Sequence, residues 1–272
     1  MRLIAGLVAA SHPVPTAVVT ALAATLVAGV GAPTGTVVLV VFAVLAGQLS
    51  VGLSNDWLDA HRDRAAGRAD KPVATGRVPM PVVRAAALTA AVLCLAASFA
   101  VGAVAGMLHV VAVLSAWAYN LGLKSTAASW VPYAVSFGLL PAFLVRAAGG
   151  DVPAVLVVTG ALLGAGAHVA NVLPDLDDDA ATGVRGLPHR LGRRTSSVLA
   201  PLLLAAGIGV VVTGLPERSA AVLVAAVAGG LLALAAGAVA LVRPVSRAPF
   251  LLSMGVAVVA VGLLVTSGAR QS

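Results

Sequence analysis

The chain has 272 residues, of which 60% are hydrophobic and 10% are charged, with a formal net charge of +7. Soluble globular domains carry about 25% charged residues, so this composition excludes an ordinary soluble domain and indicates a polytopic membrane protein. The basic residues form no run interleaved with aromatic residues, which argues against nucleic-acid binding. The single cysteine, Cys94, lies in an apolar run and excludes an intrachain disulfide.

The N-terminus begins with one basic residue followed by apolar residues, as a signal peptide would. Ser11-His12-Pro13 interrupts this apolar stretch, and a full-length apolar segment follows at once. We therefore interpret the first residues as a juxtamembrane segment rather than a cleaved signal.

Nine apolar stretches are long enough to cross a bilayer, which takes about 20 residues of helix. Backbone polar groups in lipid must be satisfied within the chain, so these stretches predict helices. They occupy most of the sequence and predict a single all-α membrane domain over residues 1–272, a bundle of nine transmembrane helices. The predicted spans are residues 14–31, 34–54, 80–101, 104–122, 127–147, 153–172, 196–214, 219–241 and 249–268.

The distribution of Lys and Arg predicts the orientation of these spans. With the N-terminus in the cytoplasm, 14 of the 17 basic residues fall on the cytoplasmic side, and only Arg146, Arg218 and Arg270 fall outside. The positive-inside rule favours this arrangement. We therefore expect a multi-pass protein of the cell membrane whose C-terminus lies outside.

Acidic residues concentrate at the cytoplasmic ends of the second and sixth predicted spans. Eight of the ten acidic residues fall in these two segments, and both segments contain the spacing Asn-x3-Asp-x3-Asp. The first motif comprises Asn55, Asp56, Asp59 and Asp63, with Asp70 shortly after it, and the second comprises Asn171, Asp175 and Asp179.

The repeated spacing predicts a cation site. Residues four apart are neighbours on a helix surface, so each motif would line one helical face if the segment is helical. Two such faces turned toward each other would form an acidic cavity, and Mg²⁺ is bound by one or two carboxylates together with substrate phosphates. Two solvated acidic loops are the alternative, but they would have no reason to repeat the same spacing.

A glycine-containing basic loop follows each acidic motif. Acidic residues alone would bind a cation, whereas acidic residues beside Arg and Lys suggest a polyanion bridged by a cation, most simply a diphosphate. We attribute Arg190, Arg193 and Arg194 to membrane topology alone. The candidates for contacting the diphosphate from these loops are Arg62, Arg68, Lys71 and Arg185.

Tyr119 and Lys124 form a third polar point, at the cytoplasmic end of the fourth span. They could be an interfacial aromatic residue and a snorkelling lysine, or they could converge on the two acidic motifs. His168 lies just before Asn171, and we expect its side chain to be hydrogen-bonded within the bundle rather than to bind a metal.

The first motif, Asn55-Asp56-x2-Asp59-x3-Asp63, resembles the NDxxDxxxD motif of the UbiA-type intramembrane prenyltransferases. Asp175-x3-Asp179 resembles their second motif, DxxxD, and the resemblance extends over essentially the whole chain. Two positions depart from the family pattern. Four residues rather than three separate Tyr119 from Lys124, and Ala60 stands where many members carry Arg.

This resemblance implies nine helices around a central cavity, in which Mg²⁺ ions bind a prenyl diphosphate whose tail occupies an apolar tunnel. The implied metal-binding residues are Asn55, Asp56, Asp59, Asp63, Asp175 and Asp179. The implied catalytic residues are Asp59, Asp63, Asp175, Asp179 and Lys124. The implied diphosphate-binding residues are Asn55, Arg62, Arg68, Lys71, Tyr119, Lys124, Asn171 and Arg185.

The expected reaction is Mg²⁺-dependent transfer of the prenyl group to a lipophilic acceptor, either an aromatic compound or a quinone precursor. Chlorin and indole acceptors stay open, as do the prenyl length and the oligomeric state. A terpene cyclase of the same fold would have the same metal site, and a phosphoribosyl acceptor is a further alternative. A transporter is disfavoured because transporter carboxylates usually lie near the bilayer midplane.

Overall fold

The structure is a computed structural model, and it describes residues 2–215, 218–243 and 245–268. Every regular element within these residues is helical, in agreement with the predicted all-α class. The elements are α1 (Arg2–Ala10), α2 (Pro13–Gly29), α3 (Thr34–Leu58), α4 (Ala60–Ala65), α5 (Met80–Val101), α6 (Ala103–Leu121), η1 (Leu123–Ser125), α7 (Val131–Ala147), α8 (Ala154–Val172), η2 (Leu173–Asp175), α9 (Leu176–Ala181), α10 (Leu187–Gly214), α11 (Ala220–Val242) and α12 (Ala248–Gly268).

A long helix covers each of the nine stretches predicted to span a membrane. Within the described residues, seven helical segments are long and apolar enough to cross a bilayer on their own, and α1 with α2 forms an eighth candidate that is bent by 67°. The remaining predicted stretch, residues 127–147, corresponds to α7, an apolar helix of 17 residues. The polytopic all-α bundle is therefore confirmed with seven to eight candidate spans, and the count of nine stays a prediction.

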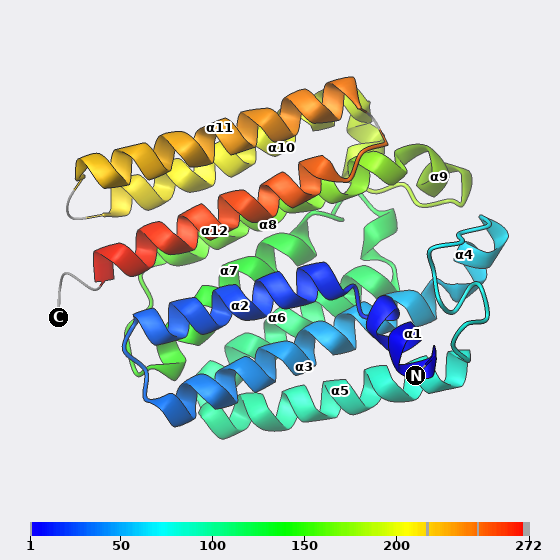
Figure 1. The fold of residues 1–272 in the computed structure, drawn as a ribbon, viewed down its shortest axis with the longest axis horizontal. Coiled ribbons are helices and arrows are strands. Elements are labelled where there is room, and N and C mark those ends of the chain that lie inside the picture. Colours follow the sequence, from blue (N-terminus) through cyan, green and yellow to red (C-terminus); the bar gives the residue numbers. More distant parts are fainter. Residues whose placement is uncertain (1, 216–217, 244, 269–272) are drawn as a thin grey trace.

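The long helices lie side by side along the long axis of the molecule (Figure 1). α10, α11 and α12 occupy one side, and α3 and α5 occupy the opposite side. The short helices α1, α4 and α9 gather at one end. Because α4 and α9 belong to the two acidic motifs, the fold brings both motifs to the same end of the bundle.

Proline and glycine set several helix boundaries. α2, α5, α7 and α10 each carry a proline in their first two positions, where the missing N–H removes no helical hydrogen bond. Gly102, between α5 and α6, and Gly122, after α6, both have φ 153°, a conformation that side chains disfavour. The turn at Gly122 starts the segment that carries Lys124.

Small residues allow the central helices to pack closely, as is typical within membranes. α8 packs against both α7 and α10. At Gly160 of α8, a Cβ atom would lie 2.1 Å from the Phe137 carbonyl oxygen of α7, and at Gly164 it would lie 2.4 Å from the Tyr133 carbonyl oxygen. Large apolar side chains such as Val92 and Leu234 face outward, where a lipid-facing surface requires them.

We predict that Gly160→Ala destabilises the protein, because the new methyl group would collide with the backbone of α7. Overpacking of this kind typically costs about 1–3 kcal/mol. The matched control is Gly230→Ala on α11, where a Cβ atom would meet nothing within 4 Å. Thermal unfolding in detergent should show a lower Tm for Gly160→Ala only, and equal Tm values for the two variants would contradict the close α7–α8 packing.

Candidate active site

The first acidic motif runs from the last turn of α3 into α4. α3 ends at Leu58, but the Asp59 N–H donates to the Asn55 carbonyl at 3.0 Å, and the Asp63 N–H donates to the Asp59 carbonyl at 2.8 Å. Helical spacing therefore continues across the break. The Asn55 side-chain amide donates to Asp59 Oδ2 at 3.0 Å, so these residues share one face as the spacing predicts.

Two basic side chains neutralise the buried Asp59 carboxylate. Lys124, on η1, forms an ion pair with Asp59 Oδ1, and Arg62 Nη2 lies 2.8 Å from Asp59 Oδ2. Burial lowers the pKa of the Lys124 ammonium, and the negative charge of Asp59 opposes this shift. The interval between Tyr119 and Lys124, although one residue longer than the family pattern, thus brings Lys124 to the first motif.

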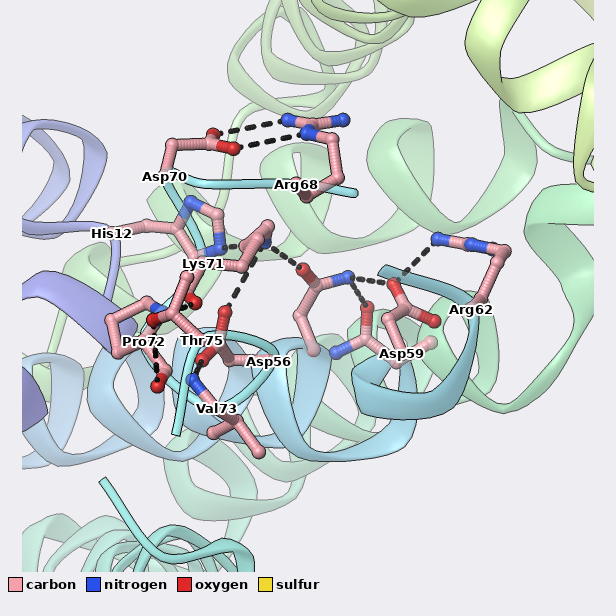
Figure 2. A network of polar contacts seen from close by, with 12 residues as sticks. His12, Asp56, Asp59, Arg62, Arg68, Asp70, Lys71, Pro72, Val73 and Thr75 are labelled. Atoms are coloured by element: carbon pink, nitrogen blue, oxygen red, sulfur yellow. Dashed lines mark hydrogen bonds and ion pairs between the residues drawn. The ribbon is translucent and has the colours of Figure 1, made fainter. Parts of the chain in front are cut away.

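Lys71 lies at the centre of a second group of contacts (Figure 2). Its ammonium donates to Asn55 Oδ1 at 3.2 Å and lies 3.4 Å from Asp56 Oδ1. The other Asp56 oxygen accepts from the Val73 N–H at 3.2 Å, which fixes the loop after the motif against α3. The third contact of Lys71 is His12 Nε2, at 3.3 Å, from the corner between α1 and α2.

The second motif departs from helical spacing. α8 ends at Val172, and the η2 segment with Pro174 intervenes before Asp175 and α9. Proline lacks the N–H that would continue the α-helical hydrogen bonds, so the turn tightens there. The Asn171 side chain donates to the Tyr133 hydroxyl at 3.4 Å. Within the described chain, the second motif therefore lacks a side-chain bond like that between Asn55 and Asp59, and its shared helical face stays a prediction.

Arg68 connects the two motifs. Its guanidinium lies 3.6 Å from Asp175 Oδ1 and also forms a bidentate pair with Asp70, at 3.0 and 3.1 Å. The Arg68 guanidinium holds the pKa of the Asp70 carboxyl well below its usual range. Arg247, just before α12, reaches the same carboxylate at 3.3 Å. The basic loop after the first motif is thereby fixed to the second motif and to the last helix.

Other predicted residues near the second motif have distinct environments. Asp179, on α9, lies 3.8 Å from His189 Nε2. His168 is buried and its Nε2 lies 3.0 Å from Ser129 Oγ, which confirms the expected hydrogen bond within the bundle. Arg185 is exposed, and no ion pair joins it to either motif within the described residues.

Several residues near the motifs were not predicted as part of the site. Besides His12, Asn120 bridges the first motif, because its side-chain oxygen accepts from Asn55 at 3.3 Å and its amide donates to Ser54 Oγ at 2.8 Å. Asn120 lies between the singled-out Tyr119 and Lys124, which was the available signal. Arg193 Nη2 lies 3.1 Å from Asp177 Oδ2, a pair at the surface, because Asp177 is almost fully exposed.

Asp63 provides a direct test of whether the residues suit a cation. Its side chain is 5% exposed, and its Oδ2 atom has no hydrogen-bond partner. Burial raises the pKa of this carboxyl. Within the described part of the chain no three His, Cys, Asp or Glu side chains cluster closely enough to bind a metal by themselves. Mg²⁺ needs only one or two carboxylates together with phosphate oxygens, so the donor set fits it.

Fold and site together define a polytopic membrane protein with a paired acidic and basic site at one end of an all-α bundle. The model of the UbiA prenyltransferase family matches residues 17–265, and the chain belongs to this family. This membership agrees with the family that the sequence resemblance predicts.

Among curated proteins, the chain is similar to the bacteriochlorophyll synthase 33 kDa chain of Cereibacter sphaeroides, with 37% identity over 183 residues. This match covers 62% of the chain and 60% of that relative, which is less than two thirds of the relative's length.

Two solved structures share the fold. A UbiA homolog from Aeropyrum pernix K1 in its apo form has a TM-score of 0.77 and 19% identity, covering 92% of this chain and 97% of that chain. A UbiA homolog from Archaeoglobus fulgidus bound to GPP and Mg²⁺ has a TM-score of 0.75 and 15% identity, covering 97% and 98%.

We predict that Asp63→Asn raises the thermal stability of the metal-free protein at neutral pH. The folded-state pKa of Asp63 lies above its unfolded value, so the native state binds more protons between the two values, and stability falls as pH rises to the folded pKa. The stability gained by the variant should therefore shrink as pH is lowered through that raised pKa.

Tm measured against pH in a chelator tests this prediction, with the fully exposed Asp151→Asn as a matched control. A lower Tm for Asp63→Asn than for wild type at neutral pH would show that the buried charge is already compensated.

Proposed function

We propose that the protein catalyses Mg²⁺-dependent transfer of a prenyl group from a prenyl diphosphate to a lipophilic acceptor within the membrane. The observation that carries this proposal is the pairing of two carboxylate motifs with basic side chains at one end of the bundle, joined by the 3.6 Å contact between Arg68 and Asp175. Prenyl diphosphate and Mg²⁺ are the ligands named for the related Archaeoglobus structure, which supports the same pairing here.

The proposed metal-binding residues are those of the two motifs: Asn55, Asp56, Asp59, Asp63, Asp175 and Asp179. Bound Mg²⁺ would act as a Lewis acid that neutralises charge on the leaving diphosphate. The unpartnered Asp63 oxygen and the carboxylate of Asp59 are suitable donors. Without a cation, Lys124 and Arg62 supply the positive charge that Asp59 requires.

The basic residues have the complementary role of binding the diphosphate. Arg can pair bidentately with phosphate oxygens, and Lys provides a compact point charge. Arg62, Arg68, Lys71 and Lys124 all lie on aspartates of the motifs, so they are positioned to contact an anion held there. The remaining proposed diphosphate contacts are Asn55, Tyr119, Asn171 and Arg185.

An aromatic cluster next to the site suits the carbocation that forms when the allylic C–O bond ionises. The rings of Tyr119 and Tyr133 are in edge contact at 5.3 Å, and Tyr133 stacks on Phe137 at 6.1 Å. Aromatic rings attract cations electrostatically. Asn171 binds the Tyr133 hydroxyl and so connects this cluster to the second motif. The surrounding helices would exclude water from the intermediate.

The acceptor that we propose is an aromatic or quinone-precursor compound. A chlorin-type ring is a second candidate, favoured by the 37% identity to a protein named bacteriochlorophyll synthase.

The purified protein should be incubated with Mg²⁺ and prenyl diphosphates of increasing length, with and without a panel of phenolic, quinone-precursor and chlorin acceptors. Mass spectrometry should detect a prenylated acceptor. A hydrocarbon or terpene alcohol formed without acceptor would favour cyclisation. If no prenyl diphosphate is consumed under any condition, both prenyl transfer and cyclisation are contradicted.

We predict that Asp59→Asn and Asp175→Asn each abolish turnover in membranes supplied with prenyl diphosphate and Mg²⁺. Each substitution removes a negative charge from one of the two carboxylate motifs while preserving side-chain size. Asp151→Asn, which changes an exposed aspartate between α7 and α8, is the control and should keep wild-type activity. Wild-type rates in either motif variant would contradict the assigned metal-binding role.

The proposed orientation places the site end of the bundle in the cytoplasm, in line with the bias of basic residues. α2 and α12 both run away from the end that carries α4 and α9 (Figure 1), as an odd number of crossings requires. We predict that, in a Cys94→Ser background, a cysteine at Ala66 is labelled only from the cytoplasmic side by an impermeant maleimide. A cysteine at Asp151 should be labelled only from outside, and the reverse pattern would overturn the orientation.

A further inference from the structure

We infer that His12, at the corner between α1 and α2, is a positioning residue that holds Lys71 in the diphosphate site. His12 precedes residue 17, where the match to the family model begins. The inference rests on the proposed function, because it assigns Lys71 to diphosphate binding.

Lys71 makes two side-chain hydrogen bonds and one ion pair through its ammonium. This group has three donors and no acceptor. The hydrogen bonds join it to Asn55 Oδ1 at 3.2 Å and to His12 Nε2 at 3.3 Å, and the ion pair places it 3.4 Å from Asp56 Oδ1. Figure 2 shows the contacts from His12 and Asp56 meeting at the Lys71 ammonium. Because an ammonium can only donate, His12 must accept through an unprotonated Nε2. The ring is therefore neutral, with its proton on Nδ1.

The backbone at His12 is strained in a way that serves this contact. His12 has φ 53° and ψ 66°, and it is the only residue other than glycine with a positive φ among the described residues. The left-handed conformation costs roughly 1–2 kcal/mol for a residue with a side chain. The residue before a proline is also normally extended, and Pro13 follows here. Such strain persists only where the surroundings enforce it.

The surroundings of the corner enforce this geometry. Thr16 Oγ1 donates to the Ser11 carbonyl at 2.8 Å, which closes the turn. The same carbonyl packs on α3, where a Cβ atom at Gly52 would lie 2.4 Å from it. The corner is thus fixed directly against the helix that carries Asn55 and Asp56.

α1 also packs against the far end of the basic loop. A Cβ atom at Gly6 would lie 2.3 Å from Val78 Cγ2, so α1 lies close to the loop just before α5. The loop is therefore held by α1 at one point and by His12 at another. Loss of the His12 acceptor would leave one Lys71 proton without its partner and allow the ammonium to move from its place beside Asp56.

The experiment compares His12→Phe, which keeps a ring but removes the acceptor, with His12→Gln, which retains an acceptor, and Lys71→Met. Binding of geranyl diphosphate with Mg²⁺ and the values of KM and kcat are measured for each variant. A hydrogen bond to a charged group contributes about 1.5–3 kcal/mol, so His12→Phe should weaken binding by about tenfold or more. His12→Gln should recover part of this loss.

A double-mutant cycle separates positioning from a purely structural effect. The variant with both His12→Phe and Lys71→Met should bind no more weakly than Lys71→Met alone, because His12 acts through Lys71. The inference would be overturned if the losses of binding in the two single variants multiply in the double variant. Binding by His12→Phe that equals the wild type would also overturn it.

If His12→Phe does not fold, His12→Gly removes both strain and acceptor and should fold while binding weakly. Wild-type binding by His12→Gly would also overturn the inference. Absence of binding by the wild-type protein would instead refute the proposed function, and the inference with it.

Discussion

The structure depends on neutralising buried carboxylates at one end of an apolar bundle. Unpaired charges away from water are costly, and an ion pair there needs good geometry and further hydrogen bonds. Asp59 meets this requirement through Lys124, Arg62 and Asn55, and Asp56 meets it through Lys71 and the Val73 N–H. The positions of η1, α4 and the basic loop all follow from these pairs, since each brings one cation to the first motif.

Much of this arrangement could be predicted from the sequence. Apolar stretches located the long helices, and the shared end of the two motifs followed from the parity of the spans between them. The helical register of Asn55 and Asp59 was also predictable, because spacing of four residues specifies a helix face. In the second motif the η2 segment with Pro174 interrupts the α-helix, and the Asn171 side chain donates to Tyr133.

The unpredicted part consists of contacts between distant segments. His12 and Asn120 carry no spacing that relates them to an aspartate, and only packing of the α1–α2 corner and of α6 against α3 brings them close. Arg193 was attributed to topology because a basic residue near a membrane boundary needs no partner, yet it pairs with Asp177. Local patterns specify elements and faces, whereas the partner of a long side chain depends on the tertiary arrangement.

The pair between Arg247 and Asp70 has a consequence for how the bundle closes. α12 also packs against α2, so the last helix adjoins the first long one and the helices form a closed ring rather than an open row. At the polar end, the Arg247–Asp70 pair joins the segment before α12 to the basic loop; this ion pair is exposed and is therefore screened by salt. Rising ionic strength should therefore weaken the attachment of the basic loop to the start of α12, while the packing of α12 against α2 does not depend on this pair.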